Sequence, residues 1–180
     1  MKILGIDPGF ERLGVAILEK DNGGKKPFDH AQGREHVIFS ECFKTSAKLE
    51  FSERLKLIGE EVRNIIKKYK PEVLAIETLF LNTNQKTVMR VAEARGVVVY
   101  EAARAGLKIF EATPLQIKIA TTSYGRADKT QVMKMIRILV DMENNPVRSR
   151  EGSQRPSASN GTDDELDAIA IALTRFACLK

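Results

Sequence analysis

The chain has little of what several protein classes require. Its two cysteines, Cys42 and Cys178, show no paired-ligand spacing and belong to no disulfide framework, which favours the reducing interior of a cell. No apolar run approaches the ~20 residues of a membrane helix, and the first one is broken at Asp7, too early for a signal peptide. The two histidines, His30 and His36, lie in or beside a polar loop, which favours solvated side chains over a metal pair. We therefore expect a cytoplasmic protein that is not bound to a membrane.

Length and charge narrow the possibilities further. With 180 residues the chain is long enough for one domain with a proper core and too short for two large ones. Apolar residues make up 43% and charged residues 29%, as in ordinary globular proteins. The net charge of +5 favours a polyanionic partner such as a phosphate backbone. We expect residues 1–180 to form a single domain.

Three short strands are predicted in the first quarter of the chain. The apolar run at 3–6 ends in Asp7-Pro8-Gly9, where proline removes a ladder donor and glycine permits a turn. Residues 13–18 and 36–43 read as the next two strands, with turn-forming residues at 21–27 between them. We expect an antiparallel meander with Asp7 at the C-terminal end of its first strand.

Helical and strand patterns alternate after the meander. Apolar residues recur at steps of three and four from Phe51 to Tyr69, as on one face of a helix. Strands are predicted at 73–76, which runs into Glu77, and at 108–112. The sequence thus predicts an α/β protein with a mixed five-stranded sheet, three antiparallel strands and then two parallel ones, flanked by helices.

Three more helices complete the prediction before the last polar segment. The pattern at 84–105 is apolar most of the way round, which predicts a helix buried inside the fold or against a second subunit. Thr113-Pro114 resembles an N-cap followed by proline at the first helical position. A helix is also predicted from the GRADKTQ segment at 125–131, and its expected inward residues are Val132, Ile136 and Leu139/Val140.

A polar segment separates these elements from a final helix. Residues 144–161 contain almost nothing to bury, so a flexible loop is predicted at about 145–161. Thr162 is the expected N-cap of the last helix, with Glu165 completing a capping box.

Two acids on the last helix are not explained by its start alone. At about 100° per residue, Asp164 and Asp167 lie some 60° apart beside the apolar stripe of that helix. Their mutual repulsion next to apolar surface is costly unless a cation is present.

The ends of two predicted strands supply further carboxylates. Asp7 and Glu77 each end a strand, and ligands gather at the C-terminal ends of strands in α/β sheets. Four oxygen ligands without His or Cys suit Mg²⁺ or Mn²⁺, and a pair of such ions can hold the attacking and leaving oxygens of a phosphodiester. Considered singly, however, Asp7 is more often a turn residue and Glu77 a surface acid or ion-pair partner.

Five segments carry a resemblance that joins these acids. LGIDPGFERLGVAIL, LAIETLFL, ARGVV, RADKTQV and DELDAIAIALT, in this order, resemble the bacterial RuvC family of Holliday junction resolvases, which are metal-dependent endonucleases of the ribonuclease H-like fold. The resemblance runs from residue 2 to about 176. It implies a catalytic and metal-binding quartet, with two Mg²⁺ ions or Mn²⁺ as a substitute, formed by Asp7, Glu77, Asp164 and Asp167.

The resemblance also implies how the protein acts and with what. It implies a homodimer that binds a four-way DNA junction and makes symmetric nicks in two strands, with the helix at 84–105 as the subunit contact. A RuvA and RuvB branch-migration complex is a further implied partner. Phe80 matches an aromatic residue that stacks on a base, and Lys118 and Lys129 match basic residues near the scissile phosphate. Core packing for Phe80 and ordinary solvation for the lysines are the alternatives.

Several alternatives stay open at this point. The polar insertion at 148–162 leaves a choice between Asp163 and Asp164, because Asp163 is also one turn from Asp167. A nuclease of the same fold that cuts RNA in hybrids, or a YqgF-type relative, would use similar residues. A junction-binding module that does not cut is the non-enzymatic alternative, while actin-like kinases need a second domain for which the chain has no room.

Overall fold

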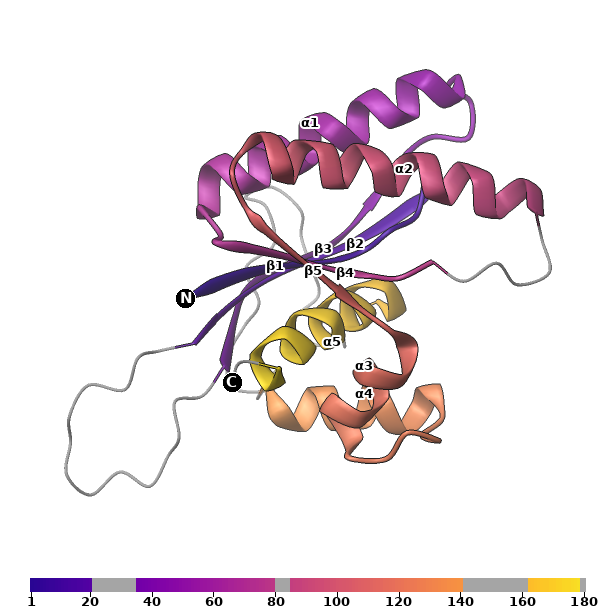
Figure 1. Ribbon diagram of the computed structural model, residues 1–180. Helices are drawn as coiled ribbons and strands as arrows, with labels where there is room; N and C mark the ends of the chain where they lie inside the picture. Colours follow the sequence, from indigo (N-terminus) through magenta and orange to yellow (C-terminus); the bar gives the residue numbers. More distant parts are fainter. Residues whose placement is uncertain (21–34, 80–84, 141–161, 179–180) are drawn as a thin grey trace.

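The protein is built on one five-stranded mixed sheet with helices on both faces (Figure 1). The computed structural model describes residues 1–20, 35–79, 85–140 and 162–178. The strand order is β3-β2-β1-β4-β5, and the strands are β1 (Lys2–Asp7), β2 (Arg12–Lys20), β3 (Glu35–Lys44), β4 (Val73–Glu77) and β5 (Lys108–Ala112). The first three pair antiparallel, whereas β4 and β5 run parallel to β1. The predicted sheet is therefore confirmed.

The helices divide between the two faces of the sheet. In Figure 1, α1 (Phe51–Tyr69) and α2 (Gln85–Arg104) cover one face, while α5 (Asp163–Ala177) covers the other. Outside α5 lie α3 (Pro114–Thr122) and α4 (Lys129–Leu139). Thr113 caps α3 with Pro114 at its first position, as expected from the sequence. The helix-and-strand order of the chain thus follows the hydrophobic periods of 3.6 and 2.

The two-residue period of the strands decides which side chains face α5. Ile3, Ala16 and Ala75 belong to the apolar core beneath α5, whereas Leu4 and Ile76 belong to the core beneath α1 and α2. Asp7 continues the odd-numbered series of β1, and Glu77 continues the odd-numbered series of β4. Both acids therefore lie on the α5 face, at the same end of the sheet.

Helix α5 is the most deeply buried of the described helices. Its predicted stripe of Leu166, Ile169, Ala170, Leu173 and Phe176 is buried, and so are Ala168, Ile171 and Ala172 around it. Two glycines let it lie almost on the sheet backbone, because a Cβ at Gly5 would stand 2.2 Å from the Ala168 carbonyl oxygen and one at Gly14 would stand 2.1 Å from that of Asp164.

Some sequence expectations were wrong in detail. Thr162 is the N-cap residue of α5, but its side chain accepts no capping hydrogen bond; its hydroxyl instead donates to Glu165, 3.2 Å away. The expected capping box is absent because the Glu165 carboxylate is drawn inward to the Ser40 hydroxyl of β3. In α4, Val140 is buried at its C-cap whereas Leu139 is 43% exposed. The predicted flexible loop at about 145–161 lies outside the described residues.

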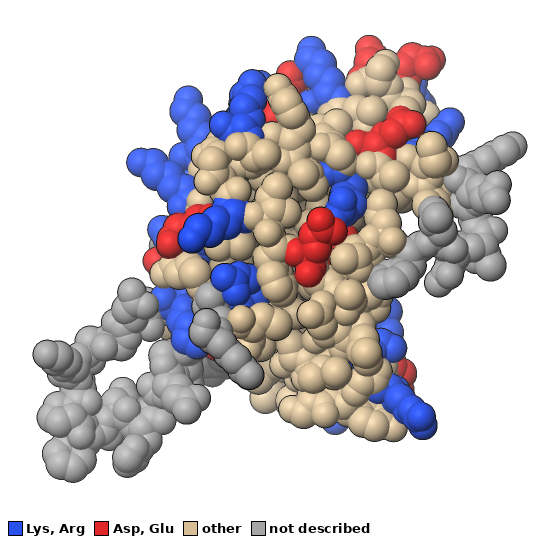
Figure 2. All heavy atoms as spheres, viewed as in Figure 1, with Lys and Arg blue, Asp and Glu red and all other residues tan. Residues whose placement is uncertain are grey.

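The outer surface carries its charge unevenly. Figure 2 shows more basic than acidic side chains over the upper part of the molecule, where α1 and α2 lie, and a mostly uncharged lower part on the same face. Among the described helices none is both long enough and apolar enough to cross a bilayer.

Candidate active site

A row of four residues crosses the α5 face of the sheet at the end of β1. Strand pairing places Gly14 beside Asp7 on one side and beside Cys42 on the other. On the opposite side of β1, Ile6 pairs with Ile76, so the next residues, Asp7 and Glu77, end the two parallel strands together. The sheet therefore presents Cys42, Gly14, Asp7 and Glu77 in this order to the first turns of α5.

Helix α5 brings the other two acids to this row. Because Gly14 has no side chain, the backbone of Asp164 can lie directly over β2. One turn along, Asp167 points into the same region and Asp163 points outward, with side chains 33% and 67% exposed. A buried hydrogen bond of 2.8 Å from Ser40 to Glu165 ties this turn of α5 to β3. The start of α5 thus lies directly over β2 at Asp164 and is hydrogen-bonded to β3 at Glu165.

Burial and mutual repulsion raise the pKa values of three carboxylates at this site. Burial, followed by the charges of Asp167, Glu77 and Asp164, raises the pKa of Asp7 from 3.8 to about 7. Burial and then Asp167 raise the pKa of Glu77. Burial is also the first cause of the raised pKa of Asp167, against the opposing effect of Lys129. Three elements thus bring together Asp7, Glu77, Asp164 and Asp167.

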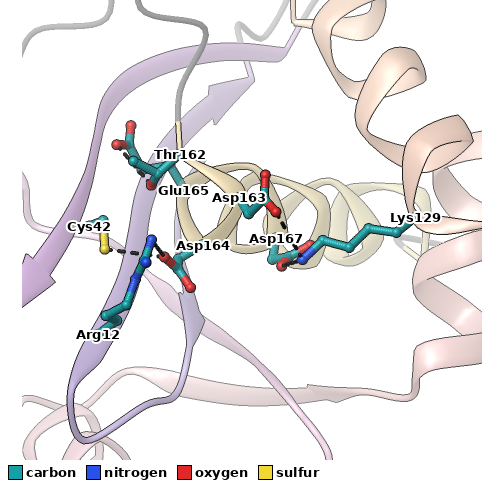
Figure 3. A network of polar contacts seen from close by, with 8 residues as sticks. All are labelled: Arg12, Cys42, Lys129, Thr162, Asp163, Asp164, Glu165 and Asp167. Atoms are coloured by element: carbon teal, nitrogen blue, oxygen red, sulfur yellow. Dashed lines mark hydrogen bonds and ion pairs between the residues drawn. The ribbon is translucent and has the colours of Figure 1, made fainter.

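Two cations of the chain itself partly balance this charge (Figure 3). The Lys129 ammonium, at the start of α4, lies 3.1 Å from an Asp167 oxygen and 3.6 Å from an Asp163 oxygen. The Arg12 guanidinium, at the start of β2, forms an ion pair with Asp164. Cys42 also donates to Asp164, with a sulfur-to-oxygen distance of 3.3 Å. Asp164 and Asp167 therefore each have a cationic partner, and the charge of Lys129 also acts on Asp7, where it opposes the rise in pKa.

The side chains at this site are chemically suited to a hard divalent ion, but ion pairs hold two of them away from a shared position. Carboxylate oxygens are the ligands that Mg²⁺ prefers, and such an ion would neutralise the neighbouring acidic charges that, after burial, raise the pKa of Asp7. Over the described residues, no three His, Cys, Asp or Glu side chains are placed to hold one ion as they stand. Ion pairing explains this, because Asp164 is turned to Arg12 and Asp167 to Lys129.

A pocket opens beside the acids. It has a volume of about 260 Å³ and is lined by Glu77, Asp167, Lys118 and Lys129 together with apolar residues of α3, α4 and α5. The two predicted basic residues and two of the predicted acids thus line the same pocket. Phe80, the predicted stacking residue, lies outside the described residues.

Two arginines at the site were not found by sequence reasoning. Arg12 lies inside the DPGFERLG segment, but nothing in a strand pattern says that its side chain turns toward a helix 150 residues later. Arg95 of α2 donates to the Glu77 carbonyl oxygen at 3.3 Å and to the Glu111 carboxylate at 2.6 Å. It lies in the ARGVV segment, which is the only sequence signal that pointed to it. Arg95 fixes the backbone of the strand end that carries Glu77.

Comparison with known proteins gives a consistent result. The family model described as "Crossover junction endodeoxyribonuclease RuvC" matches residues 3–175. A protein of that name from Halothermothrix orenii is 39% identical over 173 residues, which cover 96% of this chain and 90% of the relative.

Solved structures show the same relationship. The structure of Thermus thermophilus RuvC aligns with a TM-score of 0.75 at 28% identity, covering 97% of this chain and 92% of the other. T. thermophilus RuvC in complex with a Holliday junction substrate aligns with a TM-score of 0.73 at 25% identity and the same coverage. The expected ribonuclease H-like fold is confirmed by this match. With the family model spanning nearly all of its length, the chain belongs to the RuvC family of crossover junction endodeoxyribonucleases.

Proposed function

We propose that this protein is a metal-dependent endonuclease that resolves Holliday junctions in DNA recombination and repair. Membership of the RuvC family supports the substrate, since a relative with the same fold is known in complex with a Holliday junction. The single structural observation that carries the proposal is the cluster of mutually repelling acids on the α5 face, with the pKa of Asp7 raised to about 7.

The proposed catalytic and metal-binding residues are Asp7, Glu77, Asp164 and Asp167. Asp164 is preferred to Asp163 because Asp164 is among the charges that raise the pKa of Asp7, whereas the Asp163 side chain is 67% exposed and interacts with Lys129. Mg²⁺ is the proposed cofactor, with two ions in each site and Mn²⁺ as a substitute. When bound there, such ions supply Lewis-acid stabilisation of the charge that develops during in-line displacement at phosphorus.

The protein's own residues position the phosphodiester. The pocket is lined by the carboxylates of Glu77 and Asp167 and by Lys118 and Lys129, so a scissile phosphate bound in it would lie within reach of both kinds of group. Each ammonium can donate to a phosphate oxygen and so hold the phosphorus atom against the acidic wall. Phe80, which follows β4 by three residues, is proposed to stack on a base at the opened junction.

A homodimer is the proposed acting unit, because two symmetric nicks require two such sites. The outer face of α2 supports this, since Met89 and Tyr100 are each 61% exposed and eleven residues apart, which places them on one side of the helix. A single domain, a cytoplasmic location and cooperation with a RuvA and RuvB branch-migration complex are further parts of the proposal.

The test is a resolution assay on a synthetic four-way junction. With Mg²⁺ the wild-type protein should nick two strands symmetrically and leave 5′-phosphate and 3′-hydroxyl ends that a ligase seals. With Ca²⁺ it should bind without cutting. The Asp7→Asn variant should also bind the junction, with cleavage reduced by at least about 100-fold, because one ligand of the proposed quartet is lost. Normal cleavage by Asp7→Asn would contradict the metal assignment.

The same assay separates the other functions that use this fold. An RNA–DNA hybrid and a plain duplex are added as competitors at equal concentration. Preferential cutting of the hybrid would indicate a ribonuclease of the same fold. Junction binding without cleavage under any divalent ion would indicate a binding module.

A further inference from the structure

The two proposed ligands on α5, Asp164 and Asp167, are paired with the chain's own cations from opposite directions. Lys129 reaches Asp167 from α4, on the side of the pocket where substrate is proposed to lie. Arg12 reaches Asp164 from the start of β2, and it does not line that pocket. Figure 3 shows the separation, with Arg12 and Cys42 on one flank of α5 and Lys129 on the other. Arg12 has no part in the proposed chemistry, so its contact with Asp164 needs its own explanation.

The Arg12 contact occupies a carboxylate that the proposed metal site needs. A guanidinium paired with Asp164 takes up a carboxylate oxygen that an ion would otherwise bind. Cys42 donates to the same oxygen, Oδ2, that pairs with Arg12. The absence of any ready three-ligand arrangement among the described residues agrees with this, since Arg12 holds Asp164 and Lys129 holds Asp167.

The Arg12 side chain is exposed enough to break its ion pair with Asp164 and take another partner. Its side chain is 50% exposed, whereas that of Asp164 is 23% exposed, so the guanidinium lies on the solvent side of the pair. An exposed arginine near a site that receives a phosphate backbone has a second partner available, because guanidinium groups bind phosphate as well as carboxylate. If Arg12 exchanges Asp164 for a phosphate, it replaces one anionic partner by another and keeps most of its favourable electrostatic energy.

We propose that Arg12 is a positioning residue that competes with the divalent ion for Asp164 and is drawn off by a DNA phosphate, so that substrate binding completes the metal site. The inference rests on the proposed metal-binding function of the acid cluster. Binding of substrate and of metal then help each other by the same factor in both directions, as linkage requires. The Arg12 contact thus keeps Asp164 from the ion until DNA is present.

The first experiment measures Mn²⁺ affinity by electron paramagnetic resonance, without DNA, for wild type and Arg12→Gln. Breaking an exposed ion pair changes an equilibrium constant by about 1.5- to 5-fold. We therefore expect Arg12→Gln to bind Mn²⁺ at least about twofold more tightly than wild type. Arg12→Lys keeps the charge but loses the planar fork, and its affinity should fall between the two.

Two further variants make the result specific. Arg63→Gln is the matched control, because Arg63 is also 50% exposed and paired with a carboxylate, that of Glu101, which belongs to no proposed site. Arg63→Gln should bind Mn²⁺ as wild type does, so an equal gain in both arginine variants would mean general electrostatics and overturn the competition. Asp7→Asn should weaken Mn²⁺ binding in every background. If it does not, the metal assignment fails, independently of Arg12.

The second experiment measures the coupling to DNA. Ca²⁺ is titrated by calorimetry into the protein with and without a four-way junction, so that binding is measured without cleavage. In wild type the junction should tighten Ca²⁺ binding by a larger factor than in Arg12→Gln, in which the competing guanidinium is already absent. Equal factors in the two proteins, or weaker Mn²⁺ binding by Arg12→Gln in the first experiment, would overturn the proposal.

Discussion

At the scale of single residues, Asp7 combines an ordinary sequence position with an unusual environment. It ends a strand before a proline, yet the sheet and α5 surround it with Glu77, Asp164 and Asp167. Its pKa of about 7 means that the folded protein holds a proton there which the unfolded chain has already released at pH 5 or 6. The metal-free site therefore opposes folding, and the opposition is complete above pH 7.

The first prediction concerns stability without metal. Asp7→Asn removes the repelled charge and should stabilise the metal-free protein at pH 8 by about 1–2 kcal/mol, after allowance for solvent screening, or about 2–8 °C in Tm. At pH 4 the residue is protonated in the folded state and partly protonated in the unfolded state, so the gain should shrink to a small part of its value at pH 8. Thermal unfolding in the presence of a chelator measures both values.

The control for this prediction is Glu60→Gln. Glu60 is a half-exposed acid of α1 that pairs with Lys56 at 3.8 Å, far from the site in the fold. Its loss should leave Tm nearly unchanged at both pH values. An Asp7→Asn protein that melts below wild type at pH 8 would show that the Asp7 charge is stabilised in the absence of metal.

Arg12 and Arg95 show the limit of reasoning from residues one at a time. Both lie in segments that resemble the family, but an arginine in a strand or helix pattern has solvation as its simplest interpretation. Their roles depend on what lies opposite: Asp164 for Arg12, and the Glu77 carbonyl for Arg95. Asp164 lies 152 positions from Arg12 and Glu77 lies 18 positions from Arg95, so only folding brings each pair into contact.

At the scale of elements, the site depends on how closely α5 approaches the sheet. Gly14 lies beside Asp7 in the antiparallel ladder and directly beneath the Asp164 backbone. No side chain can be added there without moving the helix or the strand, because the nearest atom is backbone. The same close approach at Gly5 holds the next turn of α5.

The second prediction therefore concerns Gly14→Ala. The added Cβ should displace the start of α5, lower the free energy of unfolding by about 1–3 kcal/mol and separate Asp164 and Asp167 from Asp7. Denaturant unfolding measures the first effect. Mn²⁺ affinity, measured below the unfolding transition, measures the second and should fall by at least about tenfold.

Gly125→Ala is the matched substitution for this experiment. A Cβ at Gly125 would meet only the Leu115 Cδ1 atom within 3 Å, and Leu115 is an exposed side chain that can move aside. Stability and metal affinity should both stay close to wild type. Equal behaviour of the two alanine variants would mean that the close approach at Gly14 does not control the site.

At the scale of the whole molecule, two cores on opposite faces share one sheet. The core beneath α5 holds the site, and the core beneath α1 and α2 supports the proposed subunit contact. Among the α2 residues whose burial is described, from 87 to 104, only Ala94, Val98, Glu101 and Ala102 are buried, so the prediction that this helix is buried on more than one side is not met by the subunit alone. A second subunit over Met89 and Tyr100 would meet it.

The third prediction tests this assembly. Tyr100→Glu should shift the protein from dimer to monomer in sedimentation velocity at micromolar concentration, because a carboxylate would be buried without a partner in the interface. Tyr124→Glu is the control, since Tyr124 is also exposed, at 56%, but follows α3 instead of lying on α2. A Tyr100→Glu protein that sediments with wild type would exclude this face of α2 as the contact.

The order and type of the elements, and the positions of Asp7 and Glu77 at strand ends, could be predicted from the sequence alone. Hydrophobic period and turn chemistry are local properties, so strand ends and helix starts could be predicted within a few residues. Carboxylates at two strand ends and on one helix flank were visible for the same reason, and the family resemblance joined them.

How these parts meet depends on tertiary packing. The inward bond from Ser40 to Glu165, the close approach over Gly14 and the outward direction of Asp163 follow from how α5 packs on the sheet. That packing depends on contacts between segments more than a hundred residues apart, which leave no periodic trace in the sequence. The pairing of Arg12 with Asp164 is of the same kind, because charge attraction acts through space between whichever groups the fold places together.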